Sequence, residues 1–317
     1  MDDAVSAALP LPQLRGRAMV TDGGMETDLI FHHGVDLPCF AAFPLLESAR
    51  GRELLAGYYH GYAAIARRAG AGLVLDSPTW RANPDWGGRL GYSPADLARV
   101  NTSAIALLAQ LRDGYAATVA DIVVSGMVGP QGDGYQPGQL PSPEQAEAYH
   151  RPQIDAFAQA GADMVSALTL TSTGEAIGIV RAARAAGLPV AISFTVETDG
   201  RLAGGIPLAR AITEVDDAAG PDYFMVNCAH PSHIAPALAE PGGWRERIAG
   251  VRYNASAKSH AELDQDTGLD DGDPRLLAAG HAQLVPLLPR LSVVGGCCGT
   301  DARHVAALWR ADQAAGT

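Results

Sequence analysis

Three of the four cysteines in this 317-residue chain follow apolar runs, where side chains of a folded domain can converge. Cys228 ends the run 222–228, and Cys297 and Cys298 close the run 291–298 between glycines. Three thiolates around one ion favour zinc, and three protein ligands leave the fourth tetrahedral position open, as in catalytic zinc sites. Two alternatives stay open, a vicinal redox pair of Cys297 with Cys298 and a chance approach of core cysteines.

The ligand type indicates the kind of reaction. Zinc hydrolases prefer histidine and carboxylate ligands, because a less negative ligand set keeps bound water acidic. Three thiolates donate heavily to the metal and are poorly suited to activating water. They are better suited to holding a substrate thiol as its nucleophilic thiolate. This pattern therefore favours alkyl transfer to sulfur.

The elements that would position these cysteines alternate regularly along the chain. Short, nearly continuous apolar runs are typical of strands buried on both faces of a parallel sheet. They occupy residues 18–24, 72–77, 121–129, 163–170, 189–195, 222–228, 249–255 and 291–298. Helical spacing fills residues 49–71, 93–114, 142–162, 173–187, 207–220, 232–240, 274–289 and 301–311.

This alternation predicts an α/β fold, a (β/α)8 TIM barrel forming one domain over residues 1–317; an open doubly wound sheet is the alternative. Chemistry in such barrels lies at the carboxyl ends of the strands. The ends of the sixth and eighth strands would bring Cys228 close to Cys297 and Cys298.

Composition limits the partners and the location. The formal net charge of −12 and the lack of a basic stripe argue against nucleic acid. No apolar run reaches the roughly 18 residues that a membrane span needs, and the acidic N-terminus does not resemble a secretory signal. Four cysteines do not make a disulfide framework in a chain this long. We therefore expect a cytoplasmic protein without membrane partners; assembly into a homo-oligomer is left open.

Several motifs together carry a likeness to a known family. "VNC" at 226–228 and "GGCCGT" at 295–300 resemble the paired zinc motifs of the homocysteine S-methyltransferase family. "TDGGMETDLIFHHG" (21–34), "VSGMVGPQGDGY" (124–135) and "ISFTVETDGRLAGGIPL" (192–208) extend the likeness over nearly the whole chain. The resemblance implies Zn2+ bound by Cys228, Cys297 and Cys298, and transfer of a methyl group to homocysteine, giving methionine in methionine biosynthesis.

The resemblance also implies the partners. No second module large enough for cobalamin is present, so the expected methyl donor is a direct one: S-methylmethionine, S-adenosylmethionine or a betaine-type ammonium compound. Alternatives are methylation of a different small thiol, a zinc-dependent lyase or hydrolase, and a non-catalytic zinc- or thiol-binding barrel.

The same resemblance points to residues that bind substrate. Asp22 matches the family's acidic residue for the amino group, and Leu168 replaces a family glutamate with that role. Glu26 stands where many members have glycine or alanine. The full candidate set is Asp22, Gly23, Gly24, Glu26, Asp76, Thr79, Asn227 and Gly295.

Two loops at the same rim are further candidates. Residues 256–274 are rich in acids and are either a solvated loop or a lid whose negative field favours a cationic donor. Trp80 and Trp86 follow the second strand, where they either pack or face a cationic donor. His230 is expected to be a histidine of the rim rather than a metal ligand.

Overall fold

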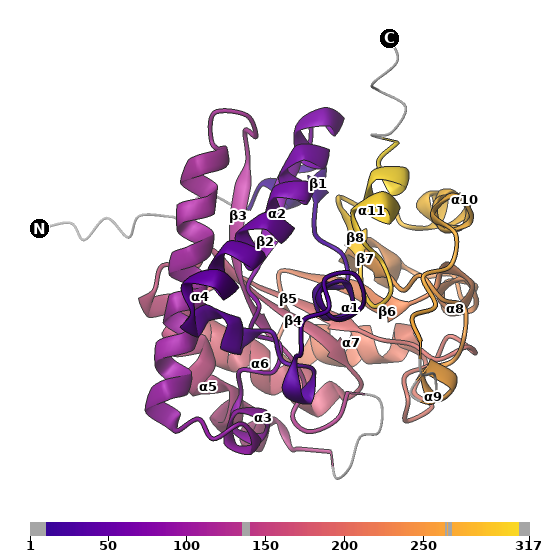
Figure 1. Cartoon of the computed structure of the whole chain (residues 1–317). Helices are drawn as coiled ribbons and strands as arrows, with labels where there is room; N and C mark the ends of the chain where they lie inside the picture. Colours follow the sequence, from indigo (N-terminus) through magenta and orange to yellow (C-terminus); the bar gives the residue numbers. More distant parts are fainter. Residues whose placement is uncertain (1–10, 135–139, 264, 266–267, 311–317) are drawn as a thin grey trace, which may run out of the picture.

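The computed structural model describes residues 11–134, 140–263, 265 and 268–310. Across them, eight parallel strands close into a barrel in the order β1 to β8, which confirms the predicted (β/α)8 architecture (Figure 1). The strands are β1 (Met19–Val20), β2 (Gly72–Asp76), β3 (Ile122–Val128), β4 (Met164–Leu170), β5 (Val190–Phe194), β6 (Tyr223–Ala229), β7 (Ile248–Tyr253) and β8 (Val293–Gly296).

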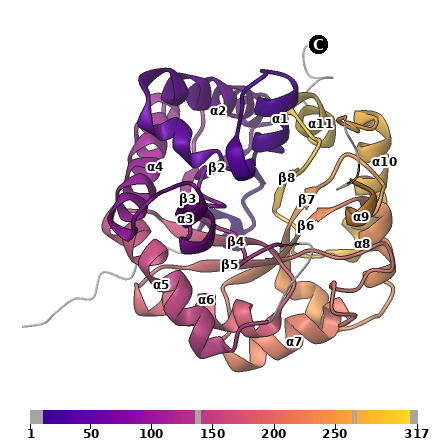
Figure 2. The same cartoon turned by 60° about the horizontal axis from the view of Figure 1, so that its bottom comes forward.

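Helices surround the barrel on its outer side, as the view along it shows (Figure 2). One helix after each strand completes the repeating unit: α2 (Ala49–Ala69), α4 (Pro94–Tyr115), α5 (Pro143–Gln159), α6 (Thr173–Ala185), α7 (Leu208–Ala218), α8 (Pro231–Ala237), α10 (Pro274–Leu284) and α11 (Ala302–Leu308). Short 3-10 helices occupy Pro12–Arg15, Pro38–Phe40, Phe43–Glu47, Gly243–Arg247 and Val285–Leu287. In the described part of the chain, no helix is long and apolar enough to cross a membrane.

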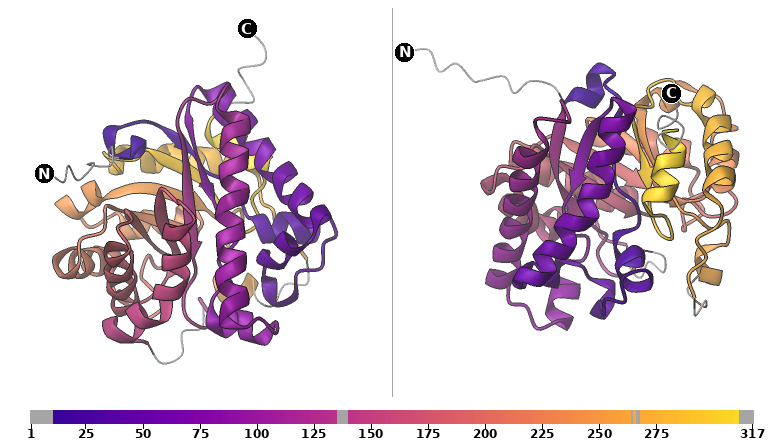
Figure 3. Two further views of the ribbon diagram at one scale, coloured as in Figure 1. Left: turned by 90° about the vertical axis from the view of Figure 1, so that its left-hand side faces the viewer. Right: turned by 45° about the horizontal axis from the view of Figure 1, so that its top comes forward.

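Helix starts follow the sequence signals. Ser142 accepts a hydrogen bond from the backbone of Gln145, whose side chain accepts one from the backbone of Ser142, so this Ser-x-x-Gln sequence forms a capping box. A serine followed by proline also begins α4. These caps satisfy backbone donors that the first helical turn leaves open. The long helices α2 and α4 then stand along the outside of the barrel (Figure 3).

The first strand was predicted too long. β1 ends at Val20, and residues 21–24 make single backbone hydrogen bonds to β8 and the turn after it before an unpredicted helix, α1 (Met25–Phe31), begins. At Gly24 the chain meets the turn after β8: its amide donates to the carbonyl of Thr300 at 3.0 Å, and a Cβ there would lie 2.5 Å from the carbonyl oxygen of Cys297. Two further short helices, α3 (Pro84–Arg89) and α9 (His260–Leu263), also lie in segments expected to be loops.

The barrel interior changes from apolar to polar along its axis. One cluster of buried residues, with members from every strand, fills one level: Met19, Val74, Val123, Met164, Ala191, Tyr223, Met225, Ala249 and Val293. Polar side chains follow toward the carboxyl ends, where Ser125 and Ser166 hydrogen-bond at 2.7 Å and Ser193 donates to Asn227 at 2.6 Å. Because buried polar groups are costly unless they are hydrogen-bonded, these pairs are part of the ordered interior, and they form the bottom of the site at the carboxyl ends of the strands.

Candidate functional site

The three predicted cysteines converge. Cys228 lies near the end of β6, and Cys297 and Cys298 directly follow β8. Their sulfur atoms all lie within 4.8 Å of one another. The Sγ atoms of Cys228 and Cys298 are 3.5 Å apart. The spacing is compact enough for all three sulfurs to reach one metal ion.

The turn that carries the cysteine pair is pinned by backbone contacts. The amide of Cys297 donates to the carbonyl of Tyr253 at 2.7 Å, and Ala255 donates to the carbonyl of Cys298 at 3.1 Å. Gly295 lies so close to β1 that an added Cβ would be 2.7 Å from the carbonyl oxygen of Asp22. This approach fixes the height of both sulfurs above the barrel floor.

Cys228 has a left-handed backbone, with φ of 55°. Such a conformation is costly for a residue with a side chain and persists only where its surroundings hold it. Here three side chains donate to its carbonyl oxygen: His260 Nε2 at 2.7 Å, Asn254 Nδ2 at 3.0 Å and Thr195 Oγ1 at 3.2 Å. The surroundings thus hold the Cys228 backbone from three elements.

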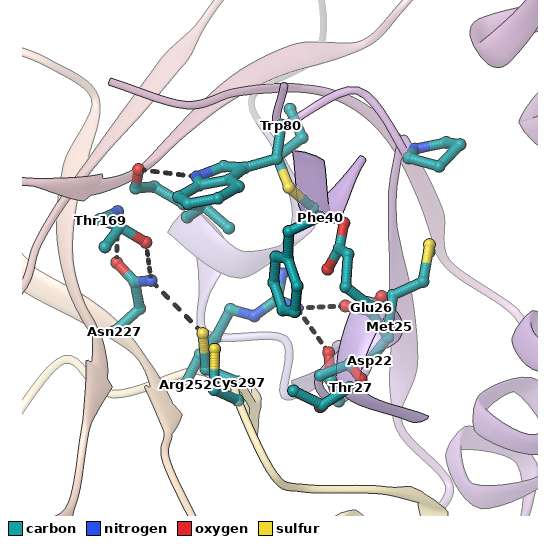
Figure 4. A pocket seen from close by; sticks show the side chains of 16 residues that line it. Asp22, Met25, Glu26, Thr27, Phe40, Trp80, Thr169, Asn227, Arg252 and Cys297 are labelled. Carbon is teal, nitrogen blue, oxygen red and sulfur yellow. Dashed lines mark hydrogen bonds and ion pairs between the residues drawn. The ribbon is translucent and has the colours of Figure 1, made fainter. Parts of the chain in front are cut away.

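Thr169 at the end of β4 is also left-handed, with φ of 64°. Asn227 braces it: its Oδ1 accepts from the Thr169 amide, and its Nδ2 donates to Thr169 Oγ1, both at 2.8 Å. The same Nδ2 lies 3.7 Å from the Sγ atom of Cys297 (Figure 4). Asn227 therefore links the strained strand end to the cysteine cluster.

The thiols do not ionise equally. Hydrogen bonds from Cys297 and Cys298 lower the pKa of the Cys228 thiol. Hydrogen bonding with Cys228 raises the pKa of Cys297 to about 12 and also raises the pKa of Cys298. An ionised Cys228 thus disfavours ionisation of its two neighbours, and a bound cation would offset this repulsion.

A buried guanidinium lies beside the cysteines. Arg252, on β7, is 3% exposed and forms ion pairs with Asp22 and with Asp76, the latter at 2.6 Å. Its Nε also donates to the carbonyl of Gly296 at 3.0 Å. Arg252 therefore joins the ends of β1, β2 and β8. Sequence reasoning missed it, although a charged residue inside the apolar run 249–255 was a usable signal.

Two pockets meet at Cys298. We call the smaller one, of about 50 Å3, the inner pocket; its lining includes Asp22, Glu26, Met127, Leu168, Asn227, Arg252, Cys297 and Cys298. The outer pocket, of about 360 Å3, is lined by residues that include Phe31, Asp133, His260, Leu263, Leu269, Asp270 and Cys298. Phe40, Trp80 and Thr27 line both. The cysteine cluster thus lies where two ligands could meet.

The other predicted substrate residues divide into two groups. Asp22, Gly23, Gly24, Glu26 and Asn227 line the inner pocket. Asp76, Thr79 and Gly295 are not among its lining residues. Thr79 is fully buried and donates to the carbonyl of Met127 at 2.7 Å, and Asp76 is 2% exposed and paired with Arg252. Their side chains support the walls rather than face the cavity.

The rim loops have separate roles. Trp86 packs beneath Arg81 and donates to the carbonyl of Gly132 at 2.9 Å, whereas Trp80 lines the pockets. In the loop 256–274, residues 264 and 266–267 lie outside the described residues. The role of His260 in this segment was not predicted. Its Nδ1 lies 2.9 Å from Oε1 of Glu197, and the residue lines the outer pocket. His230 caps α8.

Known proteins resemble the chain over most of its length. A family model described as "Homocysteine S-methyltransferase" matches residues 19–311. Homocysteine S-methyltransferase of Escherichia coli K12 is 26% identical, over 92% of this chain and 94% of that protein. Homocysteine S-methyltransferase YbgG of Bacillus subtilis 168 is 24% identical, with coverage of 90% and 92%. The crystal structure of the metallated E. coli homocysteine methyltransferase MmuM matches with a TM-score of 0.72 at 22% identity, over 94% of this chain and 99% of that one.

Proposed function

Because the chain belongs to the homocysteine S-methyltransferase family, we propose that it transfers a methyl group from a sulfonium or ammonium donor to homocysteine, giving methionine. The observation that carries the proposal is the position of Cys298, which lines both the inner and the outer pocket. A methyl transfer needs two substrates in contact, and a cluster of thiols at their meeting point is the expected arrangement.

The donor set supports a zinc ion as the resident metal. Three sulfurs within 4.8 Å of one another, without a fourth protein ligand among the described residues of this cluster, fit an open tetrahedral thiolate site. Cys228, Cys297 and Cys298 would hold the ion. When bound, zinc would supply the acidity that keeps the acceptor sulfur ionised near neutral pH.

We place the acceptor in the inner pocket and the donor in the outer pocket. The inner pocket is small and offers carboxylates, an amide and a guanidinium, as an amino acid requires. The acceptor sulfur would attack the donor methyl carbon in line, forming the new S–CH3 bond as the bond to the donor heteroatom breaks. The electron pair of that bond stays on the donor sulfur or nitrogen, which thereby loses its positive charge.

The outer pocket suits a cationic donor. Trp80 and Phe40 present aromatic rings, and Asp133 and Asp270 add carboxylates. Aromatic faces and negative charge both attract a sulfonium or quaternary ammonium group. The volume of about 360 Å3 leaves room for a ligand larger than the acceptor.

The test is a methyl-transfer assay on zinc-loaded protein. Homocysteine and other small thiols are paired with S-methylmethionine, S-adenosylmethionine and glycine betaine, and products are identified by mass spectrometry. Methionine formation that Cys298→Ala abolishes would support the proposal. Turnover with a different thiol alone would move the acceptor assignment. Bound zinc without methylation of any thiol would overturn the proposal.

A further inference from the structure

Three carboxylates lie in or behind the wall of the inner pocket that β1 and β2 form. Asp22 precedes α1, Glu26 belongs to its first turn, and Asp76 ends β2. One cation, Arg252, pairs with this group from β7. The charges therefore do not balance, and which carboxylate stays unpaired decides where a positively charged part of a ligand can bind.

Arg252 uses its guanidinium on the two aspartates. It forms ion pairs with Asp22 and Asp76, and it also donates to the carbonyl of Gly23 at 3.2 Å. Tyr58 donates a further hydrogen bond to Asp22 Oδ2 at 3.2 Å, and Thr21 donates one to Asp76 at 3.2 Å. Both aspartates are 2% exposed. Neither is free to give a whole charge to a ligand.

Glu26 is different. Among the described residues, no ion pair or hydrogen bond joins its carboxylate to another side chain, and it lines the inner pocket. Figure 4 shows Glu26 on the same side as Asp22 and Met25, across the pocket from Thr169 and Asn227. Burial raises its pKa to about 7, although the charges of Arg252 and Arg81 oppose the shift, so its negative charge is unfavourable while no cation contacts it directly.

Among the described residues that line the inner pocket, Asp22 and Glu26 carry the only carboxylates. Leu168 and Met127 are apolar, with exposures of 3% and 9%, and the Trp80 indole donates to the carbonyl of Leu168 at 3.3 Å. The charged partner of an ammonium group in this pocket must come from the β1–α1 junction. An ammonium group there would offset the burial of the Glu26 charge through a charge-assisted hydrogen bond.

We propose that Glu26 binds the ammonium group of the acceptor and so selects amino-acid thiols over thiols that lack an amine. Asp22 positions Arg252 and shapes the wall behind it. The inference rests on the proposed function, because it assumes that the acceptor occupies the inner pocket. It places the amine beside α1 and the acceptor's hydrocarbon chain against Leu168.

The experiment compares homocysteine with 4-mercaptobutanoate, which is homocysteine without its amine. Binding to zinc-loaded protein is measured by calorimetry without a donor, and kcat and KM are measured with one. Glu26→Gln should weaken homocysteine binding on the order of 10- to 100-fold, as expected for loss of a charged hydrogen bond, and leave 4-mercaptobutanoate nearly unchanged. The kcat with saturating homocysteine should change little, and Glu26→Asp should recover part of the affinity.

Two variants make the result interpretable. Glu53→Gln removes one exposed negative charge from α2 and should leave the binding of both thiols unchanged. Asp22→Asn should weaken the binding of both thiols by the same factor, since it disturbs the ion pairs of Arg252. The inference would be overturned if Glu26→Gln weakened the binding of both thiols equally. It would also be overturned if Asp22→Asn alone removed the preference for homocysteine over 4-mercaptobutanoate. Absence of turnover in the wild-type protein would overturn the proposed function, whereas the calorimetric comparison would still test Glu26.

Discussion

The inner and outer pockets meet at Cys298 but are built from different parts of the fold. The inner pocket stands on strand ends: Thr169, Asn227 and Arg252 are each 3% exposed or less and are held by several hydrogen bonds. The outer pocket takes much of its lining from loops and short helices, including Phe31, which is 47% exposed, and Asp270. One pocket is fixed by the barrel and the other by its connections.

This difference separates two kinds of specificity. A pocket wall made of strand ends tolerates few substitutions, because each of its residues is also packed in the interior of the barrel. A wall of loops can vary without cost to the core. We therefore expect the chemistry and the acceptor to depend on the inner pocket, and the identity of the donor to depend on the outer one.

The largest effect is expected where the pockets meet. Cys228→Ala removes one sulfur of the cluster and should lower both bound zinc and methyl transfer, the latter by about 1000-fold or more, since few other groups at the site can replace a ligand. Metal content by mass spectrometry and the transfer rate check this. Cys39→Ala lies outside the cluster and serves as the control. Full activity of Cys228→Ala would show that the cluster does not carry the chemistry.

The second-largest effect is expected at Arg252 in the wall of the inner pocket. Arg252→Met leaves Asp22 and Asp76 buried without their cation and should lower the free energy of unfolding by about 3–5 kcal/mol. Denaturant unfolding measures the loss. Arg17→Met breaks a half-exposed pair with Asp121 and should cost at most about 1 kcal/mol. A similar loss of unfolding free energy in the two variants would show that the buried ion pairs of the inner pocket contribute no more stability than a surface ion pair.

A smaller effect concerns stability and pH. The folded protein holds the Glu26 proton more tightly than the unfolded chain does, because burial raises its pKa from 4.5 to about 7. Ionisation across this window therefore costs stability, which is lost as pH rises from 4.5 to 7. Glu26→Gln should thus be more stable than the wild type by about 3 kcal/mol at pH 8 and about equal to it at pH 4.5. A larger gain at the lower pH would contradict this sign.

The smallest effect should come from the outer wall. Asp270→Asn removes one carboxylate that faces the outer pocket, and Lys258, at 3.6 Å, partly neutralises that carboxylate. The KM for a cationic donor should rise by about two- to five-fold at low salt, and the KM for the acceptor should not change. Steady-state kinetics at two ionic strengths measure both, with the exposed Asp36→Asn as control. A change in the KM for the acceptor alone would show that the outer pocket does not bind the donor.

The sequence was most informative where a residue type coincided with a strand end. Cys228, Cys297 and Cys298 follow apolar runs whose repetition already predicted the barrel, so their convergence could be derived. β1 was the exception: Gly24, its predicted last residue, packs against Cys297 and donates its amide to Thr300, both in the turn after β8.

Residues that act through tertiary contacts were harder to predict. Arg252 pairs with a residue more than 170 positions away, and His260 reaches Cys228 from the short helix α9, which no periodicity in the sequence indicated. Thr79 and Asp76 have the right types and positions for a binding role, but their hydrogen bonds turn them into the wall. Side-chain direction at a strand end depends on neighbouring strands, which one segment of sequence does not encode.

The short first strand has a consequence for how the protein closes. β1 registers with β2 and with β8 through two residue pairs each, so the ladder at the joint between the start and the end of the chain is brief. Arg252 adds a link across this joint, from β7 to the ends of β1 and β2. Completing the ring and assembling the site are therefore one event: a partly open ring would lack both the paired aspartates and the cysteine turn. Any ligand that binds only the closed ring must also hold it shut.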